Sequence, residues 1–375
     1  MVDDEERTPE AMPSDGTPKS RRVPDRRKNN MRGRRQAPKL AALDLGTNNC
    51  RLLIAVPRGR RFRVIDAFSR IVRLGEGLSA SGSLSRDAMA RAIEAIKICA
   101  DKINQRGVTH GRFIATQACR AAENGAEFLA EVEETTGLKF EIISTEEEAR
   151  LAVSGCADLF DQDAEAGLVF DIGGGSTEIS WVRPSPDQSG HHDQKRALEI
   201  AAWHSMPIGV VTLSEKWGGR EINPETYAQI VESVRAEIRA CGDPANLREV
   251  FAAGRAHFLG TSGTVTSIAG VHLALPRYRR DLVDGLWLTS EEARSVSQKL
   301  CAMSYEDRAA EPCIGEERAD LVVCGCAILE ALNLEWPVAR IRVGDRGLRE
   351  GILSDLAVSA KKKRRRRKKR AKPAS

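Results

Sequence analysis

A segment rich in glycine has the composition of a phosphate-binding turn. Residues 171–178 read D-I-G-G-G-S-T-E and follow the apolar run Leu-Val-Phe. The three glycines tolerate positive φ and let a ligand approach the backbone closely. Successive N–H groups in such a turn form a concavity that suits an anion. Asp171 and Glu178 flank the turn, and their carboxylates can hold a hard cation such as Mg²⁺.

Two further segments offer similar chemistry. Residues 44–49 (D-L-G-T-N-N) also follow an apolar strand and present side-chain donors in place of two of the glycines. Residues 260–264 (G-T-S-G-T) precede a predicted helix, where free N–H groups and the helix dipole favour an anion. Taken alone, this last segment is explained equally well by an ordinary Ser/Thr helix cap. Three such turns at strand ends in one chain indicate a phosphate site.

Three consecutive glutamates, Glu146, Glu147 and Glu148, open another predicted helix. A capping box, in which Ser144 pairs with Glu147 or Thr145 with Glu148, explains such a cluster. The functional alternative is that one glutamate faces a cleft and activates water for attack on phosphorus. A bound polyanion also needs cationic partners, and the candidates are Arg70, Arg73 and Arg120.

Six motifs, taken in order, resemble the exopolyphosphatase/guanosine pentaphosphate phosphatase family. They are D-L-G-T-N-N, T-Q-A-C-R-A-A, I-I-S-x-x-E-E-A-R-L, D-I-G-G-G-S-T-E, G-x-S-G-T and D-R-G-L-R-E-G, and the match runs over about residues 40–356. The resemblance implies the fold of the actin, Hsp70 and sugar-kinase superfamily, which is α/β with two ribonuclease-H-like domains around an interdomain cleft. It also implies Mg²⁺-dependent release of the terminal phosphate of polyphosphate, or of the 5′-terminal phosphate of guanosine pentaphosphate.

The same resemblance implies roles for individual residues. Glu148 would be the catalytic base. The metal would be held by Asp44, Asp171 and Glu178. The phosphate-binding residues would be Gly46, Thr47, Asn48, Arg120, Gly173, Gly174, Gly175, Ser176, Gly263 and Thr264. Asn49 stands where members of the family often carry Ser, and the chain is similar to the short form of the family.

An internal duplication predicts the domain organisation. An apolar strand that ends in Asp, a hairpin and a second apolar strand occur at residues 39–56 and again at 167–182. Such a repeat suggests two related α/β domains with a cleft between them. We expect a last helix over residues 346–356. The expected parts are a disordered arm (1–39), an N-terminal domain (40–162), a C-terminal domain (163–358) and a basic disordered tail (359–375).

The charge is distributed unevenly along the chain. The net charge of +5 combines +4 in residues 1–39, +11 in residues 361–372 and −10 in the body between them. An acidic body of this size predicts an enzyme with a basic tail and excludes a uniformly basic nucleic-acid-binding fold. No apolar run is long enough to cross a bilayer, and the arm lacks the apolar core of a secretory signal. The nine scattered cysteines favour reduced thiols and a cytoplasmic location.

Three functions are therefore compared. The first is an exopolyphosphatase, and the second is a guanosine pentaphosphate phosphatase of the stringent response with the same fold. The third is a regulator that binds polyphosphate or a nucleotide without hydrolysing it, for which a glutamate in the base position is not needed. The basic tail is either a solvated extension or a contact for a polyanion such as polyphosphate, RNA or an anionic membrane. A homodimer and a monomer are both open alternatives at this stage.

Overall fold

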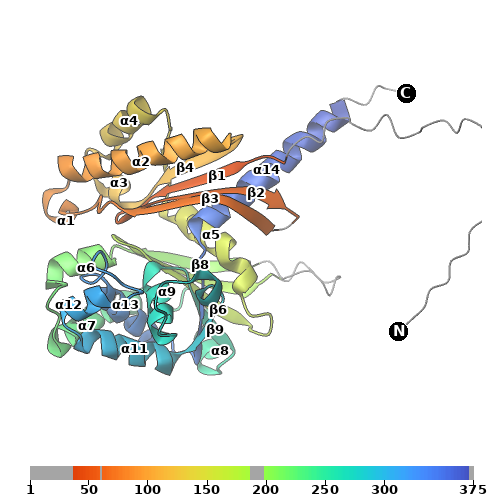
Figure 1. Cartoon of the computed structure of the whole chain (residues 1–375). Coiled ribbons are helices and arrows are strands. Elements are labelled where there is room, and N and C mark those ends of the chain that lie inside the picture. Colours follow the sequence, from red (N-terminus) through yellow and green to blue (C-terminus); the bar gives the residue numbers. More distant parts are fainter. Residues whose placement is uncertain (1–36, 60, 186–197, 371–375) are drawn as a thin grey trace, which may run out of the picture. The chain divides into compact units, whose positions relative to one another are not determined.

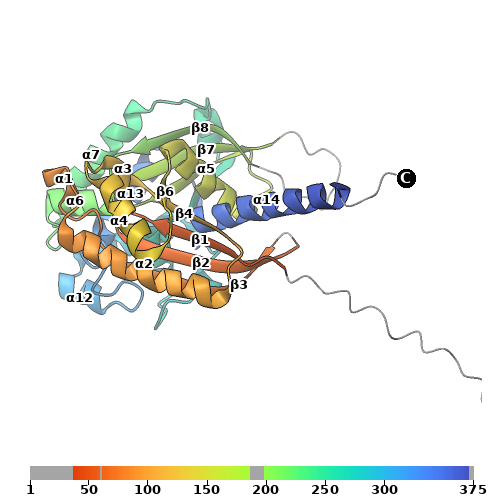
Figure 2. The same ribbon diagram turned by 90° about the horizontal axis from the view of Figure 1, so that it is seen from above.

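The computed structural model describes residues 37–59, 61–185 and 198–370. From Pro38 on, the chain forms one unit with two mixed sheets, each covered by helices, as Figures 1 and 2 show. This confirms the expected α/β fold class. The expected arm lies almost wholly outside the described residues, as do the last five residues of the tail. Within the described part, no helix is both apolar and long enough to span a membrane.

The first sheet has the strand order β3-β2-β1-β4-β5. Strands β1 to β3 are antiparallel neighbours, whereas β4 pairs parallel to β1 and β5 parallel to β4. Successive side chains of a strand point to opposite faces of the sheet. In β1 and β2 buried residues lie on both faces, so these two strands run through the interior of this half of the protein. The strands are β1 (Leu40–Leu45), β2 (Asn49–Arg58), β3 (Arg61–Ile71), β4 (His110–Ala115) and β5 (Glu141–Ile142).

Helices cover both faces of this sheet. The amphipathic helix α2 (Arg86–Arg106), capped by Ser85, buries its apolar side with α3 (Gln117–Ala121) and α4 (Gly125–Thr136) on one face. On the other face, α5 (Thr145–Cys156) packs beside α14 (Leu348–Arg370). The end of the chain therefore returns to the first sheet, although the sequence analysis grouped residues 348–358 with the second domain.

The second sheet repeats the strand pattern of the first. Its order is β10-β11-β9-β6-β7-β8, with β6 to β8 antiparallel and β9 and β11 parallel to β6. Strands β8-β7-β6-β9-β11 thus correspond to β3-β2-β1-β4-β5, which is the duplication expected from the sequence. The strands are β6 (Ala166–Ile172), β7 (Thr177–Pro184), β8 (Leu198–Met206), β9 (Ala256–Gly260), β10 (Trp287–Thr289) and β11 (Arg340–Val343).

The largest apolar core lies on one face of the second sheet. Phe170, Phe258, Trp181 and Trp336 are fully buried there, and Trp181 and Trp336 pack edge to face. The remaining helices, most of which cover this sheet, are α1 (Leu78–Ser81), α6 (Val210–Trp217), α7 (Pro224–Ala240), α8 (Arg248–Ala252), α9 (Gly263–His272), α10 (Arg280–Val283), α11 (Ser290–Ala302), α12 (Tyr305–Ala310) and α13 (Val322–Glu335), with a 3₁₀ turn at Ala157–Leu159.

Helix α14 is longer than the sequence analysis expected. It begins at Leu348 and runs to Arg370, whereas the predicted helix ended at residue 356. The reason is that Lys and Arg are good helix formers, so that a run of basic residues prolongs a helix that is already nucleated by packing.

Glycines bring α5 and α14 into close contact. A Cβ added to Gly155 would lie 1.9 Å from the carbonyl oxygen of Gly347 and 3.0 Å from the nitrogen of Gly351. A Cβ added to Gly351 would lie 2.2 Å from the carbonyl oxygen of Leu151. We expect Gly155→Ala to lower the free energy of unfolding by about 2–3 kcal/mol, because the two helices must move apart. Urea titration followed by circular dichroism measures this change.

Ser154→Ala is the matched control for Gly155→Ala. Ser154 is the exposed neighbour on the same helix, so its substitution should change the free energy of unfolding by less than about 0.5 kcal/mol. Equal midpoints for Gly155→Ala and Ser154→Ala would show that the helices do not need this close approach.

A buried histidine couples stability to pH. His257 packs against Phe160 and Trp287, accepts a hydrogen bond from the Asp161 N–H at Nε2, and points Nδ1 at the carbonyl oxygen of Phe258. Burial lowers the pKa of His257 from 6.5 to about 4. The unfolded chain therefore binds the proton more readily between these values, and stability falls as the pH drops through this window, by on the order of 3 kcal/mol.

This pH dependence is measured by urea titrations at pH 7, 5.5 and 4. His257→Gln should flatten the part of the curve that lies between pH 6.5 and 4, whatever its effect at pH 7. A variant whose stability falls as steeply as that of the unaltered protein would assign the pH dependence to other groups.

Candidate functional site

The turn after β6 combines carbonyls that are bonded within the protein with N–H groups that are free. The turn is closed by the Gly173 N–H, which donates to the Ser176 carbonyl at 2.9 Å. The carbonyls of Gly173 and Gly174 accept hydrogen bonds from the first N–H groups of α6, at Val210 and Val211. Within the described part of the chain, the N–H groups of Gly174, Gly175 and Ser176 have no acceptor. Three successive free donors form an anion-binding concavity.

The turn between β1 and β2 is built in the same way. Its Gly46 N–H donates to the Asn49 carbonyl at 2.9 Å, as Gly173 does to Ser176. The turn is held from outside by the next loop, where Val72 and Arg73 donate to the Asn48 carbonyl and Gly75 donates to the Thr47 carbonyl. The two sheets therefore each supply one tight turn with the same closing hydrogen bond.

The two turns touch, and this contact is what requires glycine. A Cβ on Gly174 would lie 3.0 Å from the Cβ of Thr47 and 3.1 Å from the backbone nitrogen of Asn48, and one on Gly175 would lie 2.8 Å from the Thr47 hydroxyl. None of the three glycines 173–175 has a positive φ. The turn therefore does not use the freedom of glycine to adopt positive φ, and what glycine provides here is the close approach, because the space for a side chain is missing.

A third group of donors comes from the start of α9. Ser262 caps this helix by accepting from the Val265 N–H, which leaves the N–H groups of Gly263 and Thr264 without intrahelical partners. The helix dipole adds a partial positive charge at this end.

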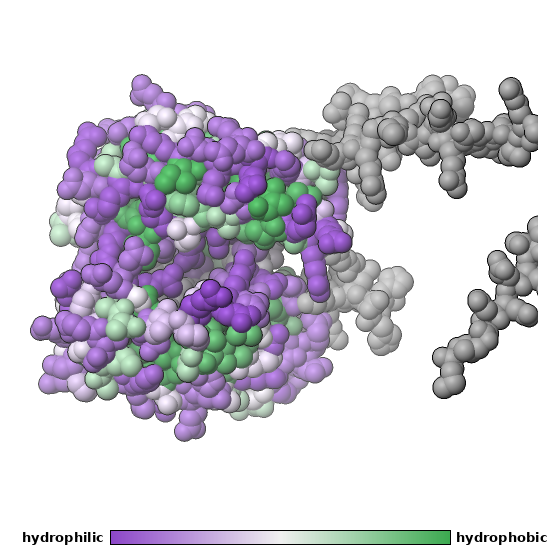
Figure 3. Space-filling view, in the orientation of Figure 1, coloured by the Kyte–Doolittle hydropathy of each residue, from purple (hydrophilic) through white to green (hydrophobic). Residues whose placement is uncertain are grey.

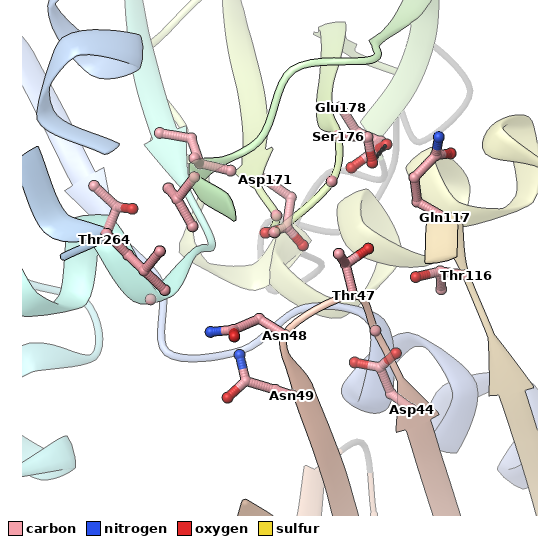
Figure 4. Close-up of a pocket in the computed structure, with 18 of the residues that line it drawn as sticks. Asp44, Thr47, Asn48, Asn49, Thr116, Gln117, Asp171, Ser176, Glu178 and Thr264 are labelled. Carbon is pink, nitrogen blue, oxygen red and sulfur yellow. Dashed lines mark hydrogen bonds between the residues drawn. The ribbon is translucent and has the colours of Figure 1, made fainter. Parts of the chain in front are cut away.

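These elements enclose one cavity of about 120 Å³ between the two sheets. The space-filling view shows the corresponding hollow between the two halves (Figure 3), and the close-up shows side chains from both sheets turned towards it (Figure 4). Thirteen of the fourteen predicted site residues line the cavity, and they are Asp44, Gly46, Thr47, Asn48, Glu148, Asp171, Gly173, Gly174, Gly175, Ser176, Glu178, Gly263 and Thr264.

The three consecutive glutamates have three different environments. Glu146 is exposed, and Glu147 forms ion pairs with Arg112 and Arg150 that hold the pKa of its carboxyl down at about 2. Ser144 caps the helix through the Glu147 N–H, but the Glu147 side chain turns to these arginines, so the predicted capping box is only half formed. Glu148 alone is buried and faces the cavity.

Arg120 lies behind Glu148 and is the one predicted site residue outside the cavity lining. Both of its terminal nitrogens donate to Oε2 of Glu148 at 3.1 Å. Its other hydrogen bonds go to the Ile143 carbonyl and the Gln117 amide oxygen, at 2.7 and 2.8 Å. The guanidinium therefore orients the Glu148 carboxylate, and the structure does not place it in direct reach of the cavity.

Four carboxylates line the cavity, of which those of Glu148 and Glu178 belong to buried residues and those of Asp44 and Asp171 to half-buried ones, and desolvation raises the pKa of each. Burial and the nearby Glu178 raise the pKa of Asp171 to about 7. For Glu148 the same two causes raise the pKa well above its usual range, against the lowering effect of Arg120. Burial also raises the pKa of Asp44 and of Glu178, which accepts hydrogen bonds from Ser176 and Ser205. When these carboxylates are ionised, their charge needs a positive partner.

The residues around the cavity fit a divalent cation that is shared with a phosphate ligand. Among the described residues, no three His, Cys, Asp or Glu side chains lie close enough to form a complete metal site. Mg²⁺ in phosphate-transfer sites commonly takes only one or two carboxylates and completes its shell with water and substrate oxygens. The side-chain oxygens of Asn48 and Asn49 are buried without a hydrogen-bond partner in the described chain, so further oxygen donors are available.

Sequence analysis missed three arginines near the cavity. Arg51 and Arg318 line it, and Arg51 and Arg349 act electrostatically on Asp44. Arg51 lies opposite Asp44 in the strand register, on the same face of β2 as Asn49, so strand alternation offered a signal for it. Arg318 has no such signal, because it comes from a loop before α13. Of the arginines singled out earlier, Arg70 stacks on Phe68, and Arg73 donates two hydrogen bonds to Asp320.

The model of the Ppx/GppA phosphatase family matches residues 53–360. Exopolyphosphatase 2 of Mycobacterium tuberculosis, in strains CDC 1551 and H37Rv, is 29% identical over 333 residues, which cover 85% of this chain and 98% of the relative.

Solved structures show the same similarity. The Aquifex aeolicus member of the Ppx/GppA family superposes with a TM-score of 0.68 at 25% identity, over 86% of this chain and 98% of that one. An exopolyphosphatase-like protein has a TM-score of 0.72 at 28% identity, over 85% and 97% of the two chains. The exopolyphosphatase of Cytophaga hutchinsonii, at 21% identity and a TM-score of 0.71, shares the fold over 86% and 98%.

Proposed function

Because the chain belongs to the Ppx/GppA phosphatase family, we propose that it is an exopolyphosphatase that releases the terminal phosphate of inorganic polyphosphate. The observation that carries the proposal is the juxtaposition in one cavity of free N–H donors, from the turn after β6 and from the start of α9, with the buried Glu148 that Arg120 orients. The M. tuberculosis relative named exopolyphosphatase 2 supports the choice of polyphosphate over a nucleotide.

The N–H groups hold the terminal phosphate in this proposal. Gly174, Gly175 and Ser176 donate from one sheet, Thr47 and Asn48 contribute from the other, and Gly263 with Thr264 close the third side. Phosphoryl transfer passes through a loose transition state with charge on the equatorial oxygens, so fixed donors around them provide most of the stabilisation. Arg51 and Arg318, which also line the cavity, offset the charge of the bound anion.

Glu148 acts on water in this proposal. Its carboxylate, oriented by Arg120, accepts a proton from a water molecule as the water oxygen forms a bond to the terminal phosphorus. The anhydride P–O bond breaks at the same time, and the leaving oxygen stays on the shortened chain. Burial raises the pKa of Glu148, so its ionised form is more basic than an exposed carboxylate.

Mg²⁺ is the proposed cofactor. It would take one or two carboxylates from among Asp44, Asp171 and Glu178, and water and phosphate oxygens would complete its shell. When bound, it would neutralise charge on the phosphate oxygens. We also propose a cytoplasmic setting, since all nine cysteines are free thiols and seven of them are buried.

The experiment that tests this function measures phosphate release from three substrates side by side: long-chain polyphosphate, guanosine pentaphosphate and p-nitrophenyl phosphate. Each is assayed with Mg²⁺ and with EDTA. The proposal expects polyphosphate to give the highest kcat/KM and EDTA to abolish release. Faster turnover of guanosine pentaphosphate would contradict the proposal and identify the protein as a guanosine pentaphosphate phosphatase. Binding of polyphosphate without any phosphate release would identify it as a regulator that does not hydrolyse its ligand.

A further inference from the structure

The last described part of α14 is an uninterrupted run of Lys and Arg. Residues 361–370 contain ten basic residues and no others, and all of them lie within the helix. Since an α-helix has 3.6 residues per turn, ten consecutive positions go round its axis almost three times. Every face of this segment, which we name the basic helix end, therefore carries positively charged positions.

The first half of α14 packs against the rest of the protein, and the basic helix end lies beyond this packed part. Leu348, Ile352, Leu353 and Ala357 are buried against the first sheet and α5. The packed part of the helix ends at Ala357, since the side chain of the next residue, Val358, is 51% exposed to solvent. In both views of the ribbon the end of α14 projects beyond the edge of the first sheet (Figures 1 and 2).

An anionic partner would stabilise a helix with this charge. Like charges at positions i and i+4 destabilise a helix, and here every such pair within the basic helix end repels. The body of the protein carries a net charge of −10, so the basic helix end stands out as a concentrated positive site on an acidic molecule. A helix that lies on a membrane surface needs an apolar face as well as a basic one, and residues 361–370 have none.

The same helix begins at the cavity. Leu348, its first residue, lines the cavity that we propose holds the terminal phosphate. At 1.5 Å per residue, the basic helix end starts about 20 Å further along the axis. A long polyphosphate chain whose end lies in the cavity has phosphates available at that distance, whereas a short chain does not.

We propose that the basic helix end binds the distal part of a long polyphosphate chain while the terminal phosphate occupies the cavity. This rests on the proposed function for the choice of polyanion, and it assigns α14 a role in selecting long substrates. Polyphosphate fits better than RNA, because one polyphosphate chain can occupy both the basic helix end and the phosphate-binding cavity at the start of the same helix.

The test compares the full-length protein with a variant in which residues 361–370 are all changed to Gln, which keeps the helix propensity while removing the charge. Binding of fluorescently labelled long-chain polyphosphate is measured by anisotropy in EDTA, over a series of salt concentrations. We expect the variant to bind at least about tenfold more weakly at low salt and to show a smaller dependence on salt, because fewer counterions are released. Phosphate release from tripolyphosphate with Mg²⁺ should be the same for both proteins, and KM for long chains should rise in the variant.

A charge-matched pair of variants controls for net charge. Lys361, Lys362 and Lys363 are changed to Gln in one, and the exposed Arg86, Lys97 and Lys139 are changed to Gln in the other. Only the first should weaken binding of long polyphosphate. Equal weakening by both variants would overturn the proposal, and so would tail-dependent binding of RNA or of anionic vesicles that exceeds binding of polyphosphate.

The two proposals fail in different ways. If the protein releases phosphate from long chains but all variants bind and turn over alike, the exopolyphosphatase assignment holds and the role of the basic helix end is wrong. If long polyphosphate binds through the basic helix end but is not hydrolysed, the role of this segment holds and the assigned activity is wrong.

Discussion

Glu148→Gln is expected to lower kcat for phosphate release by about 10²–10⁴-fold, while KM for polyphosphate changes little. Glutamine keeps the shape of the side chain and can still accept a hydrogen bond from Arg120, but it takes no proton from water. The cavity donors that bind phosphate are unaffected, so the loss falls on the chemical step. Steady-state rates of phosphate release over a range of polyphosphate concentrations separate kcat from KM.

The neighbouring glutamates are the controls. Glu146→Gln alters an exposed carboxylate and should leave kcat and thermal stability unchanged. Glu147→Gln removes the ion pairs to Arg112 and Arg150 and should lower the melting temperature without a comparable loss of kcat. If Glu146→Gln or Glu147→Gln lost as much turnover as Glu148→Gln, the cluster would act through the stability of α5 and not through one catalytic base.

Asp171→Asn is expected to lower kcat/KM by at least about 10²-fold and to abolish the response to Mg²⁺, because it removes one of the carboxylates proposed to hold the cation. The same substitution should not destabilise the protein in EDTA at pH 8. Burial, Glu178 and Asp44 raise the pKa of Asp171 to about 7, so removing its charge relieves a desolvation cost and the repulsion from these carboxylates. Loss of activity combined with equal or higher stability is the signature of a binding residue.

Thermal unfolding with and without Mg²⁺ measures the cation response independently of turnover. At a hundredfold excess of Mg²⁺ over its dissociation constant, binding should stabilise the unaltered protein by about 2–3 kcal/mol. The stabilisation should be lost in Asp171→Asn and kept in Asp163→Asn, which alters an exposed aspartate of the loop before β6. An equal rise in melting temperature for the two variants would exclude Asp171 from the cation site.

The sequence located most of the cavity lining because its turns follow from local rules, whereas the roles of individual residues came from the family resemblance. Both hairpin turns lie between apolar strands, and the duplication of that unit implied that Asp44 and Asp171 occupy equivalent positions. The structure brings these turns into contact, and the close approach of Gly174 to Thr47 explains why glycine occupies this position. Local pattern shows where a turn must form, but it contains no information on which other turn will touch it.

The parts that could not be predicted depend on contacts between distant segments. Arg120 resembles a phosphate ligand in the sequence, yet in the structure it is held by Ile143 and Gln117 against Glu148. Arg318 reaches the cavity from a loop that no motif marks. The return of α14 to the first sheet depends on Gly155 and Gly351, whose role is visible only once the two helices are packed.

The central claim is that Glu148 directs water at the terminal phosphorus, and hydrolysis in ¹⁸O-labelled water tests it most directly. The account predicts that each phosphate released from polyphosphate contains one ¹⁸O atom from water, that the shortened chain contains none, and that Glu148→Gln forms the labelled product at least about 10²-fold more slowly. Label in the shortened chain, or release of unlabelled phosphate, would show that water does not attack the terminal phosphorus. An undiminished rate in Glu148→Gln would show that another group directs it.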